Sequence, residues 1–215
     1  MTAAIAPRTL SDLIPVPSLG ERSLARRVVL VGGFALFTAA LAQVRIHLPW
    51  TPVPITGQTL GVLLAGASLG SLDGALSQVL YWVLGLTGLP FYAGGDGGWH
   101  DGTGATLGYF AGFVAAAALV GALAERRQDR TLRTAVPAMV VATFVIYVFG
   151  VAWLAHYVHV PVAVSDPNVA GGKTGISLGL TPFLAGDALK VLLAGSLTPL
   201  AWKLAGRGAA RGAAR

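Results

Sequence analysis

The sequence predicts an all-α membrane protein with six transmembrane helices and both termini in the cytoplasm. Hydrophobic residues make up 54% of the 215 positions and charged residues 11%, against about 25% charged residues in soluble domains. The apolar residues fall in runs long enough to cross a bilayer, and the basic residues flank alternate runs. The absence of cysteine excludes a disulfide framework, thiol catalysis and cysteine-ligated metal.

Five apolar runs mark the expected spans. A helix needs about 20 residues, each rising about 1.5 Å, to cross a hydrocarbon core of about 30 Å. The second run is too long for one span, and GSLDG at 70–74 interrupts it with glycines on both sides of an aspartate, a strong turn signal. Splitting it into helices at 58–71 and 74–89 gives six, the others lying at 28–46, 104–124, 134–158 and 180–204.

The distribution of basic residues sets the orientation. With six spans, twelve of the fifteen Lys and Arg residues fall on one side, in the tail at 1–27, the 124–134 loop and the C-terminal end. Basic loops stay in the cytoplasm, so both tails (1–27 and 205–215) are expected there, with residues 28–204 forming one transmembrane domain. Five spans would put the two basic ends on opposite sides.

The outer loops carry most of the distinctive residues. The segment LPWTPVPIT at 48–56 has three prolines, which predict a stiff, extended chain and a candidate lid over a site. The lid residues are Thr51, Pro52, Val53, Pro54, Ile55 and Thr56. The loop after the third helix is glycine-rich and contains Tyr92 and Trp99, and the third outer segment, at 159–179, is polar.

Two charges interrupt the last apolar run. Asp187 and Lys190 lie about 9 and 14 Å inside the outer surface if the helix enters near Thr181, and they share one helix face. Each such residue costs about 2.5–3.5 kcal/mol to insert, and charges inside membranes are functional by default. The pair therefore predicts a substrate site; the alternative is an internal ion pair that only neutralises itself.

Gln78 and Tyr81 are predicted to lie at the same depth. Counted from the outer end of the third helix near Leu89, they lie about 16 and 12 Å deep and share a face. A hydrogen-bonding pocket in the outer half of the bundle follows from this match. The alternative is inter-helix hydrogen bonding without a ligand.

Three further patterns have more than one interpretation. Ala35 and Ala39 form a small-xxx-small pair that suits either packing within the chain or a partner interface. PNVAGGKT at 167–174 nearly matches a phosphate-binding loop, but proline replaces its first glycine and no strand precedes it, so no nucleotide site is expected. His156 and His159 can bind metal in principle, but no carboxylate accompanies them at ligand spacing, so an interfacial role is favoured.

Taken together, these residues resemble the BioY family, the biotin-specific substrate-binding (S) components of energy-coupling factor (ECF) transporters. The resemblance covers nearly the whole chain after residue 28, in the family's order and spacing. The matching segments are PVPITGQTLGVLLAGASLG (52–70), LSQVLYWVLGLTGLPFYAGG (76–95), GYFAGF (108–113) and PFLAGDALK (182–190). One departure is GATLGY at 104–109, where the family tends to have G-P-T-G-G-Y.

The resemblance implies a multi-pass protein of the cytoplasmic membrane that captures biotin with high affinity. The implied partners are a transmembrane coupling (T) subunit, docked on Ala35 and Ala39, and two cytoplasmic ATPase subunits. ATP would be bound and hydrolysed only by these partner subunits. Asp187 and Lys190 correspond to the family's substrate-binding residues. No resident cofactor, metal or nucleic acid is expected.

Biotin suits the predicted pocket chemically. Its ureido N–H groups can donate to Asp187, and its carboxylate can meet Lys190. Its ring system needs apolar or aromatic walls. The candidate walls are Tyr81, Tyr92 and Trp99, with Gln58 and Gln78 as polar contacts. The alternative function is an ion-coupled secondary transporter or channel for another small carboxylate, with Asp187 as a relay. An enzyme is not expected, because the sequence offers no nucleophile or metal constellation beyond the two histidines.

Overall fold

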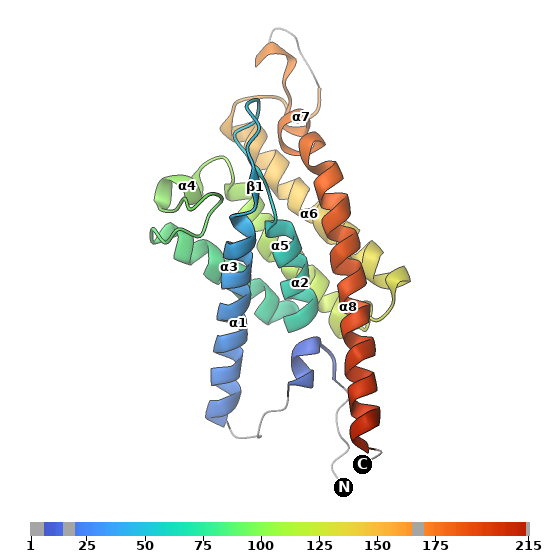
Figure 1. Cartoon of the computed structure of the whole chain (residues 1–215). Coiled ribbons are helices and arrows are strands. Elements are labelled where there is room, and N and C mark those ends of the chain that lie inside the picture. The colour runs from blue at the N-terminus through green and yellow to red at the C-terminus, as the bar shows by residue number, and fades with distance from the viewer. Residues whose placement is uncertain (1–6, 15–19, 165–169, 214–215) are drawn as a thin grey trace.

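A computed structural model describes residues 7–14, 20–164 and 170–213. Within these ranges the chain folds into a helical bundle (Figure 1), with one long helix for each predicted span. These helices are α1 (Gly20–Ala42), α2 (Gln58–Leu69), α3 (Ser71–Leu86), α5 (Leu107–Glu125), α6 (Leu132–Tyr157) and α8 (Leu184–Ala213). The loops add two short helices, α4 (Trp99–Thr103) and α7 (Gly175–Gly179), the 3₁₀ turns η1 (Leu10–Leu13), η2 (Ala170–Gly172) and η3 (Thr181–Phe183), and an antiparallel hairpin of β1 (Arg45–Ile46) and β2 (Ile55–Thr56).

Among the residues that the structure describes, four segments are long and apolar enough to cross a membrane. They are Leu24–Ala42, Leu107–Glu125, Leu132–Tyr157 and Gly175–Gly206. The 12 residues of α2 and the 16 residues of α3 extend only about 18 and 24 Å, which is less than the hydrocarbon core thickness of about 30 Å. The all-α membrane architecture is therefore confirmed, while six complete crossings remain a prediction.

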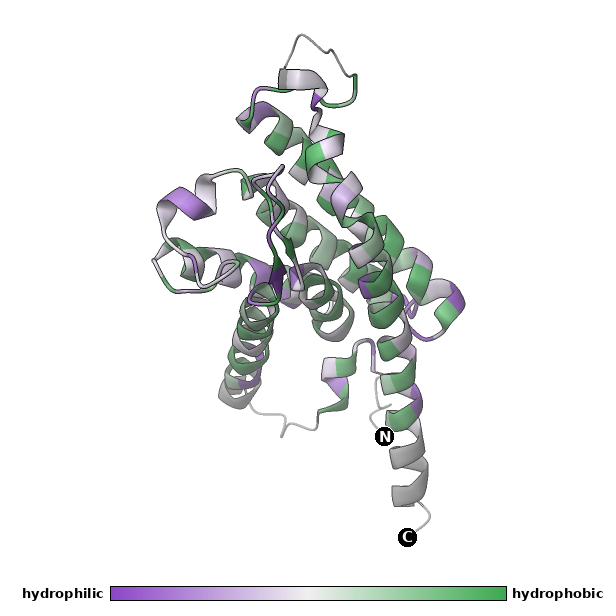
Figure 2. Cartoon of the chain, turned by 45° about the horizontal axis from the view of Figure 1, so that its top comes forward, coloured by the Kyte–Doolittle hydropathy of each residue, from purple (hydrophilic) through white to green (hydrophobic). Residues whose placement is uncertain are grey.

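The polar parts of the molecule gather at the two ends of the bundle. The β-hairpin, α4 and α7 lie at one end, and η1 and the C-terminal part of α8 lie at the other (Figure 1). Figure 2 shows hydrophobic residues along the helices and hydrophilic residues mainly in the connecting segments. This arrangement agrees with the segment 7–14 and the C-terminal part of α8 lying on one side of the membrane, and the assignment of that side to the cytoplasm stays a prediction.

The predicted break between the second and third helices is confirmed, but Asp73 lies in the first turn of α3, so the predicted turn at 70–74 is reduced to a single residue, Gly70. This residue ends α2 and precedes α3 with φ of +88°, a conformation that glycine adopts without steric penalty. The Ser71 N–H donates to Glu125 Oε1 at 2.7 Å, which ties the turn to the end of α5. A Cβ atom at Gly70 would lie 2.6 Å from that same carboxylate oxygen.

Helix α5 forms the centre of the bundle, packed against α2, α3 and α6. Small side chains permit this close packing, and Ala116 and Ala117 are both completely buried. Outward side chains such as Phe144 and Leu192 are more than half exposed, as expected for a surface that meets lipid. The core therefore forms around α5, and α1 and α8 pack at its periphery.

The first and last helices extend into the predicted tails. α1 begins at Gly20 rather than at residue 28, and α8 continues to Ala213 rather than ending at residue 204. The segment 7–14 packs through η1 against α2 and α8. The rest of the predicted N-terminal tail before residue 20, and residues 214–215, lie outside the described residues.

Candidate functional site

A cavity of about 290 Å³ opens at the hairpin end of the bundle. Its size lies at the lower limit for sites that hold small ligands, about 300 Å³. Its walls come from the hairpin, the segment around α4, and the outer parts of α2, α5, α6 and α8. The lining includes Gln58, Thr59, Tyr92, Tyr109, Phe110, Phe113, Tyr147, Phe183, Asp187 and Lys190.

Asp187 and Lys190 both line this cavity, on the first turns of α8. Lys190 Nζ lies 2.6 Å from Asp187 Oδ1, and their side chains are only 14% and 8% exposed. The Asp187 carboxylate also accepts hydrogen bonds from Thr59 Oγ1 at 3.0 Å and from the Tyr147 hydroxyl at 2.5 Å. Three donors from three helices thus compensate the buried negative charge, and the ammonium group faces the cavity with one partner.

Aromatic rings form the apolar walls. Tyr92 stacks on Phe110 with centroids 4.9 Å apart, and Tyr109 approaches Phe183 at 6.4 Å. The Tyr109 hydroxyl donates to the Gly179 carbonyl oxygen at 2.5 Å, which fixes α7 above the site. The cavity therefore offers aromatic faces around one charged corner, an arrangement suited to a small molecule with an apolar ring and few polar groups.

Tyr92 depends on the absence of a side chain at Gly85. A Cβ atom there would lie 2.2 Å from the tyrosine ring, so only glycine lets the ring pack against α3. The Tyr92 hydroxyl donates to the Trp82 carbonyl oxygen at 2.7 Å. Burial, together with the negative charge of Asp101, raises the pKa of Tyr92, so its hydroxyl stays protonated as a donor.

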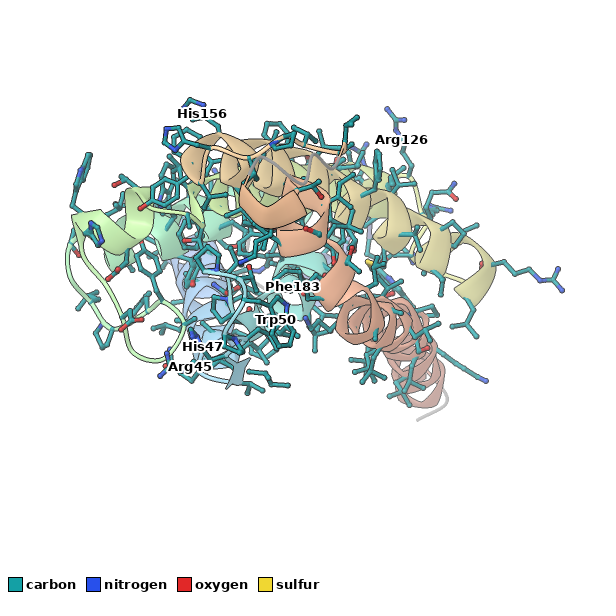
Figure 3. The ribbon with its side chains drawn as sticks, turned by 90° about the horizontal axis from the view of Figure 1, so that it is seen from above. Arg45, His47, Trp50, Arg126, His156 and Phe183 are labelled. Atoms are coloured by element: carbon teal, nitrogen blue, oxygen red, sulfur yellow. The ribbon has the colours of Figure 1, made fainter. Side chains whose placement is uncertain are left out.

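The predicted lid residues form the second half of the hairpin. Pro52, Val53, Pro54 and Thr56 line the cavity, while the Thr51 hydroxyl donates to the Leu178 carbonyl oxygen on α7 at 2.8 Å. Seen from this end in Figure 3, Trp50 and Phe183 lie near the middle of the molecule, above the bundle. The location over the site agrees with the prediction, and opening and closing remain predicted.

Gln58 and Tyr92 were predicted as contacts and do line the cavity, whereas Tyr81, Gln78 and Trp99 do not. Tyr81 is completely buried behind Gln58, whose Nε2 donates to its hydroxyl at 2.5 Å. Gln78 donates to Thr38 and Ser77 between α1 and α3, which is the alternative of hydrogen bonding between helices. Trp99 is 73% exposed on α4, because the glycine-rich loop turns it away from the bundle, so it forms no wall.

Tyr147, Thr59 and Tyr109 are site residues that the sequence reasoning missed. Tyr147 lies ten residues before the outer end of α6, hence about 15 Å deep, a depth that matches the value predicted for Lys190. The same depth comparison that selected Gln78 could therefore have found it. Thr59 and Tyr109 gave no comparable signal, since each follows a polar or glycine residue at the start of its helix.

The Ala35–Ala39 pair faces the interior of the bundle. The two residues are 0% and 7% exposed, since α1 packs this face against α2 and α3. Packing within the chain thus accounts for their small size, and the exposed face of α1 carries Leu36 and Phe37 instead. Docking of a partner on this pair stays a prediction, and it requires that the pair become accessible.

The remaining sequence patterns lie away from the cavity. His156 and His159 are exposed, and Figure 3 shows His156 at the periphery; no group of three or more metal-ligating side chains exists in the part of the chain that the structure describes. The phosphate-loop-like segment at 167–174 falls partly outside the described residues. Its final Thr174 caps α7, accepting from the Ser177 N–H at 3.1 Å.

Comparison with known proteins identifies the family. Residues 11–207 match the BioY family. The chain belongs to the BioY family. It is 34% identical to the biotin transporter BioY of Rhizobium etli over 80% of this chain and 90% of that protein, and 35% identical to that of Rhodobacter capsulatus with the same coverage.

The fold of this BioY-family chain also matches a solved structure. The crystal structure of the S-component for biotin from an ECF-type ABC transporter superposes with a TM-score of 0.71. The match covers 86% of this chain and 95% of that one at 21% identity. The fold of the described chain is therefore that of a known membrane transporter component.

Proposed function

We propose that this chain captures biotin at the outer face of the cytoplasmic membrane and serves as the S component of an ECF-type transporter. The observation that carries this proposal is the aromatic cavity with the Asp187–Lys190 pair at its charged corner, in a chain whose relatives are named biotin transporters.

The cavity matches the chemistry of biotin group by group. Its aromatic walls suit the apolar thioether ring and the valerate chain. Lys190 is the one Lys or Arg among the described lining residues, which makes it the natural partner for the carboxylate. Asp187 remains a hydrogen-bond acceptor for a ureido N–H, since Thr59 and Tyr147 hold its position.

Binding in this orientation requires the charged pair to separate. The ureido ring and the carboxylate lie at opposite ends of biotin, whereas Lys190 Nζ and Asp187 Oδ1 are 2.6 Å apart. The flexible stem of Lys190 allows its ammonium group to turn towards the ligand, while Asp187 keeps two donors. The ion pair between Lys190 and Asp187 is thus exchanged for contacts to biotin, so that neither charge is left buried without a partner.

Energy for transport is proposed to come from partner subunits. The solved S-component belongs to an ECF-type ABC transporter, and by analogy this chain would associate with a transmembrane coupling subunit and two cytoplasmic ATPase subunits. The alternative, an ion-coupled carrier that uses Asp187 as a relay, is less favoured because that carboxylate already has a lysine and two hydroxyl groups as partners.

Calorimetric titration of the purified chain tests the binding proposal. We expect one-to-one binding of biotin and weaker binding of neutral biotinamide. Lys190→Met should lower biotin affinity about 10- to 150-fold, the value of a hydrogen bond to a charged group, and change biotinamide binding much less. Lys203→Met removes an exposed lysine from the same helix and is the matched control.

The outcome separates the possibilities clearly. Undetectable biotin binding by the folded wild-type chain would refute the proposed function. An equal loss for biotin and biotinamide in Lys190→Met would refute the orientation. Uptake in proteoliposomes that follows a proton gradient without ATPase subunits would favour the carrier instead. Ala35→Leu with Ala39→Leu should abolish copurification of the coupling subunit, and it bears on docking only if biotin binding persists, because both alanines are buried.

A further inference from the structure

A second concave surface lies at the end of the bundle opposite the biotin cavity. This groove of about 970 Å³ runs between the segment 7–14, the start of α6 and the C-terminal half of α8. Its lining includes Pro7, Arg130, Leu132, Leu200, Trp202 and Lys203. None of them contributes to the site described above.

The groove lies at the boundary of the hydrocarbon core. Lys203 follows the first residue of α8 by 19 positions, which corresponds to about 28 Å of helix rise. This rise is close to the thickness of the hydrocarbon core, about 30 Å. Trp202 beside it is a residue type that concentrates at membrane interfaces. Leu132 and Leu200, on the two helices that border the groove, are 55% and 50% exposed, so the groove has apolar sides at the depth of acyl chains.

The polar end of the groove is a built cationic cluster. The Arg130 guanidinium carbon lies 3.1 Å from the centroid of the Trp202 ring, and its Nη2 donates to the carbonyl oxygens of Pro7 and Arg8 at 3.0 and 3.2 Å. Asp129 fixes both partners: Oδ2 accepts from Trp202 Nε1 at 2.5 Å, and Oδ1 accepts from Arg130 Nε at 3.3 Å. The cluster therefore joins the N-terminal segment, the α5–α6 loop and α8.

The charge at this end remains positive. Asp129 is 3% exposed, and both of its oxygen atoms face Arg130 and Trp202 rather than the open groove. Lys203 is exposed and adds a second cation on the groove wall. Basic pockets between transmembrane helices, with apolar walls below them, have the chemistry that recognises anionic lipid headgroups.

From this combination we infer that the groove binds one anionic phospholipid, with its phosphate at Arg130 and Lys203 and an acyl chain along Leu132 and Leu200. The inference rests on the membrane setting of the proposed function but not on biotin as the substrate. The lipid bridges α6, α8 and the N-terminal segment at the end of the bundle that the distribution of basic residues predicts to be cytoplasmic.

Native mass spectrometry of the full chain in neutral detergent tests this inference. The probes are phosphatidylglycerol, phosphatidylcholine with the same acyl chains, and glycerol 3-phosphate. We expect a one-to-one adduct with phosphatidylglycerol that the zwitterionic lipid does not form at the same concentration. Lys203→Gln should weaken the adduct about five-fold, the value of about 1 kcal/mol per cation at a lipid surface.

Arg126→Gln is the matched control, because this arginine lies in the same loop as Arg130, outside the groove, and points away from the bundle in Figure 3. Arg130→Gln also removes a contact of the cluster, so Lys203→Gln, at an exposed position, carries the test. Biotin titration of each sample checks that the chain is folded and reports on the biotin site separately.

Three results would overturn the inference. Equal binding of the two lipids would show that the groove does not recognise charge. An equal loss in Arg126→Gln would reduce the effect to general attraction by a basic surface. Full competition by glycerol 3-phosphate would show a phosphate site with no role for the acyl chain.

Discussion

Replacement of Asp187 by asparagine tests the central claim about the site, that its charged corner is a coupled pair. The substitution keeps the shape of the side chain and removes the charge. Lys190, 14% exposed, then loses the partner at 2.6 Å. Removing one partner of a buried ion pair lowers the free energy of unfolding by about 3–5 kcal/mol. We expect a loss of about 3 kcal/mol here, because the lysine stem can turn towards the cavity.

A double-mutant cycle separates the pair from its surroundings. Lys190→Met should lower the free energy of unfolding by less, about 2 kcal/mol, because Asp187 keeps the Thr59 and Tyr147 hydroxyl groups as donors. With both charges removed, no unpaired ion remains, and we expect the double variant to lose about 2 kcal/mol of the free energy of unfolding. The two single variants together should lose about 5 kcal/mol, so the coupling energy between the two residues is about 3 kcal/mol. The double variant should be no less stable than Asp187→Asn alone.

Thermal unfolding of the purified variants provides the assay. A loss of about 3 kcal/mol corresponds to a Tm about 6–12 °C lower for a chain of this length. Asp73→Asn is the matched control: it breaks the ion pair with Arg27, whose side chains are 39% and 27% exposed, and such a surface pair contributes about 1 kcal/mol or less. If Asp187→Asn costs no more than Asp73→Asn, or if the cycle is additive, the reasoning about a coupled buried pair is wrong.

Three further predictions follow from contacts at or near the two ends of the bundle. Tyr147→Phe removes a donor to the site carboxylate and should weaken biotin binding about five- to ten-fold in calorimetry, the value of about 1–1.5 kcal/mol for one hydrogen bond. Gly85→Ala places a Cβ atom 2.2 Å from the Tyr92 ring and should weaken biotin binding at least about ten-fold, because overpacking costs about 1–3 kcal/mol and displaces a wall. Burial raises the pKa of the Asp129 carboxyl group above its value in the unfolded chain, so the folded state binds this proton more tightly. The Tm of the wild-type chain, compared with that of Asp129→Asn, should therefore increase as the pH falls through the raised pKa.

Each of these predictions has an internal control. Tyr157→Phe alters a cavity-lining tyrosine that is 42% exposed and should leave biotin affinity nearly unchanged. Gly33→Ala adds a methyl group to α1 with no neighbouring atom within 4 Å and should be neutral or slightly stabilising. A stability difference between wild type and Asp129→Asn that does not vary with pH would show that the carboxyl group does not titrate differently on folding.

Depth in the membrane could be predicted from the sequence because each helical residue rises by a constant amount. This arithmetic put Asp187 and Lys190 in the outer half of the bundle, where both line the cavity. The turn at Gly70 was equally accessible, since a glycine-flanked aspartate between two apolar runs has few other interpretations. Charge counting likewise indicated that the two chain ends lie together.

Rotation of each helix about its own axis was not accessible in the same way. Gln78 and Tyr81 were selected by depth alone, but α3 turns them towards α1 and the back of Gln58 rather than into the cavity. Soluble helices reveal their orientation through one apolar face, whereas membrane helices are apolar all round and give a much weaker signal. Depth would also have selected Tyr147 on α6, but depth does not show that this tyrosine faces the site while Gln78 and Tyr81 face away from it.

The sequence by itself determined the class of protein, the set of six helices, the turn between the two short ones and the helix that carries the charged pair. These features depend on hydrophobicity, spacing and loop charge, which act locally along the chain. Only the tertiary structure decided which side chains surround the pair, that Trp99 faces outwards, and that Ala35 and Ala39 pack inside. Those outcomes depend on how helices far apart in the sequence rotate and pack against α5, an interaction that no local pattern encodes.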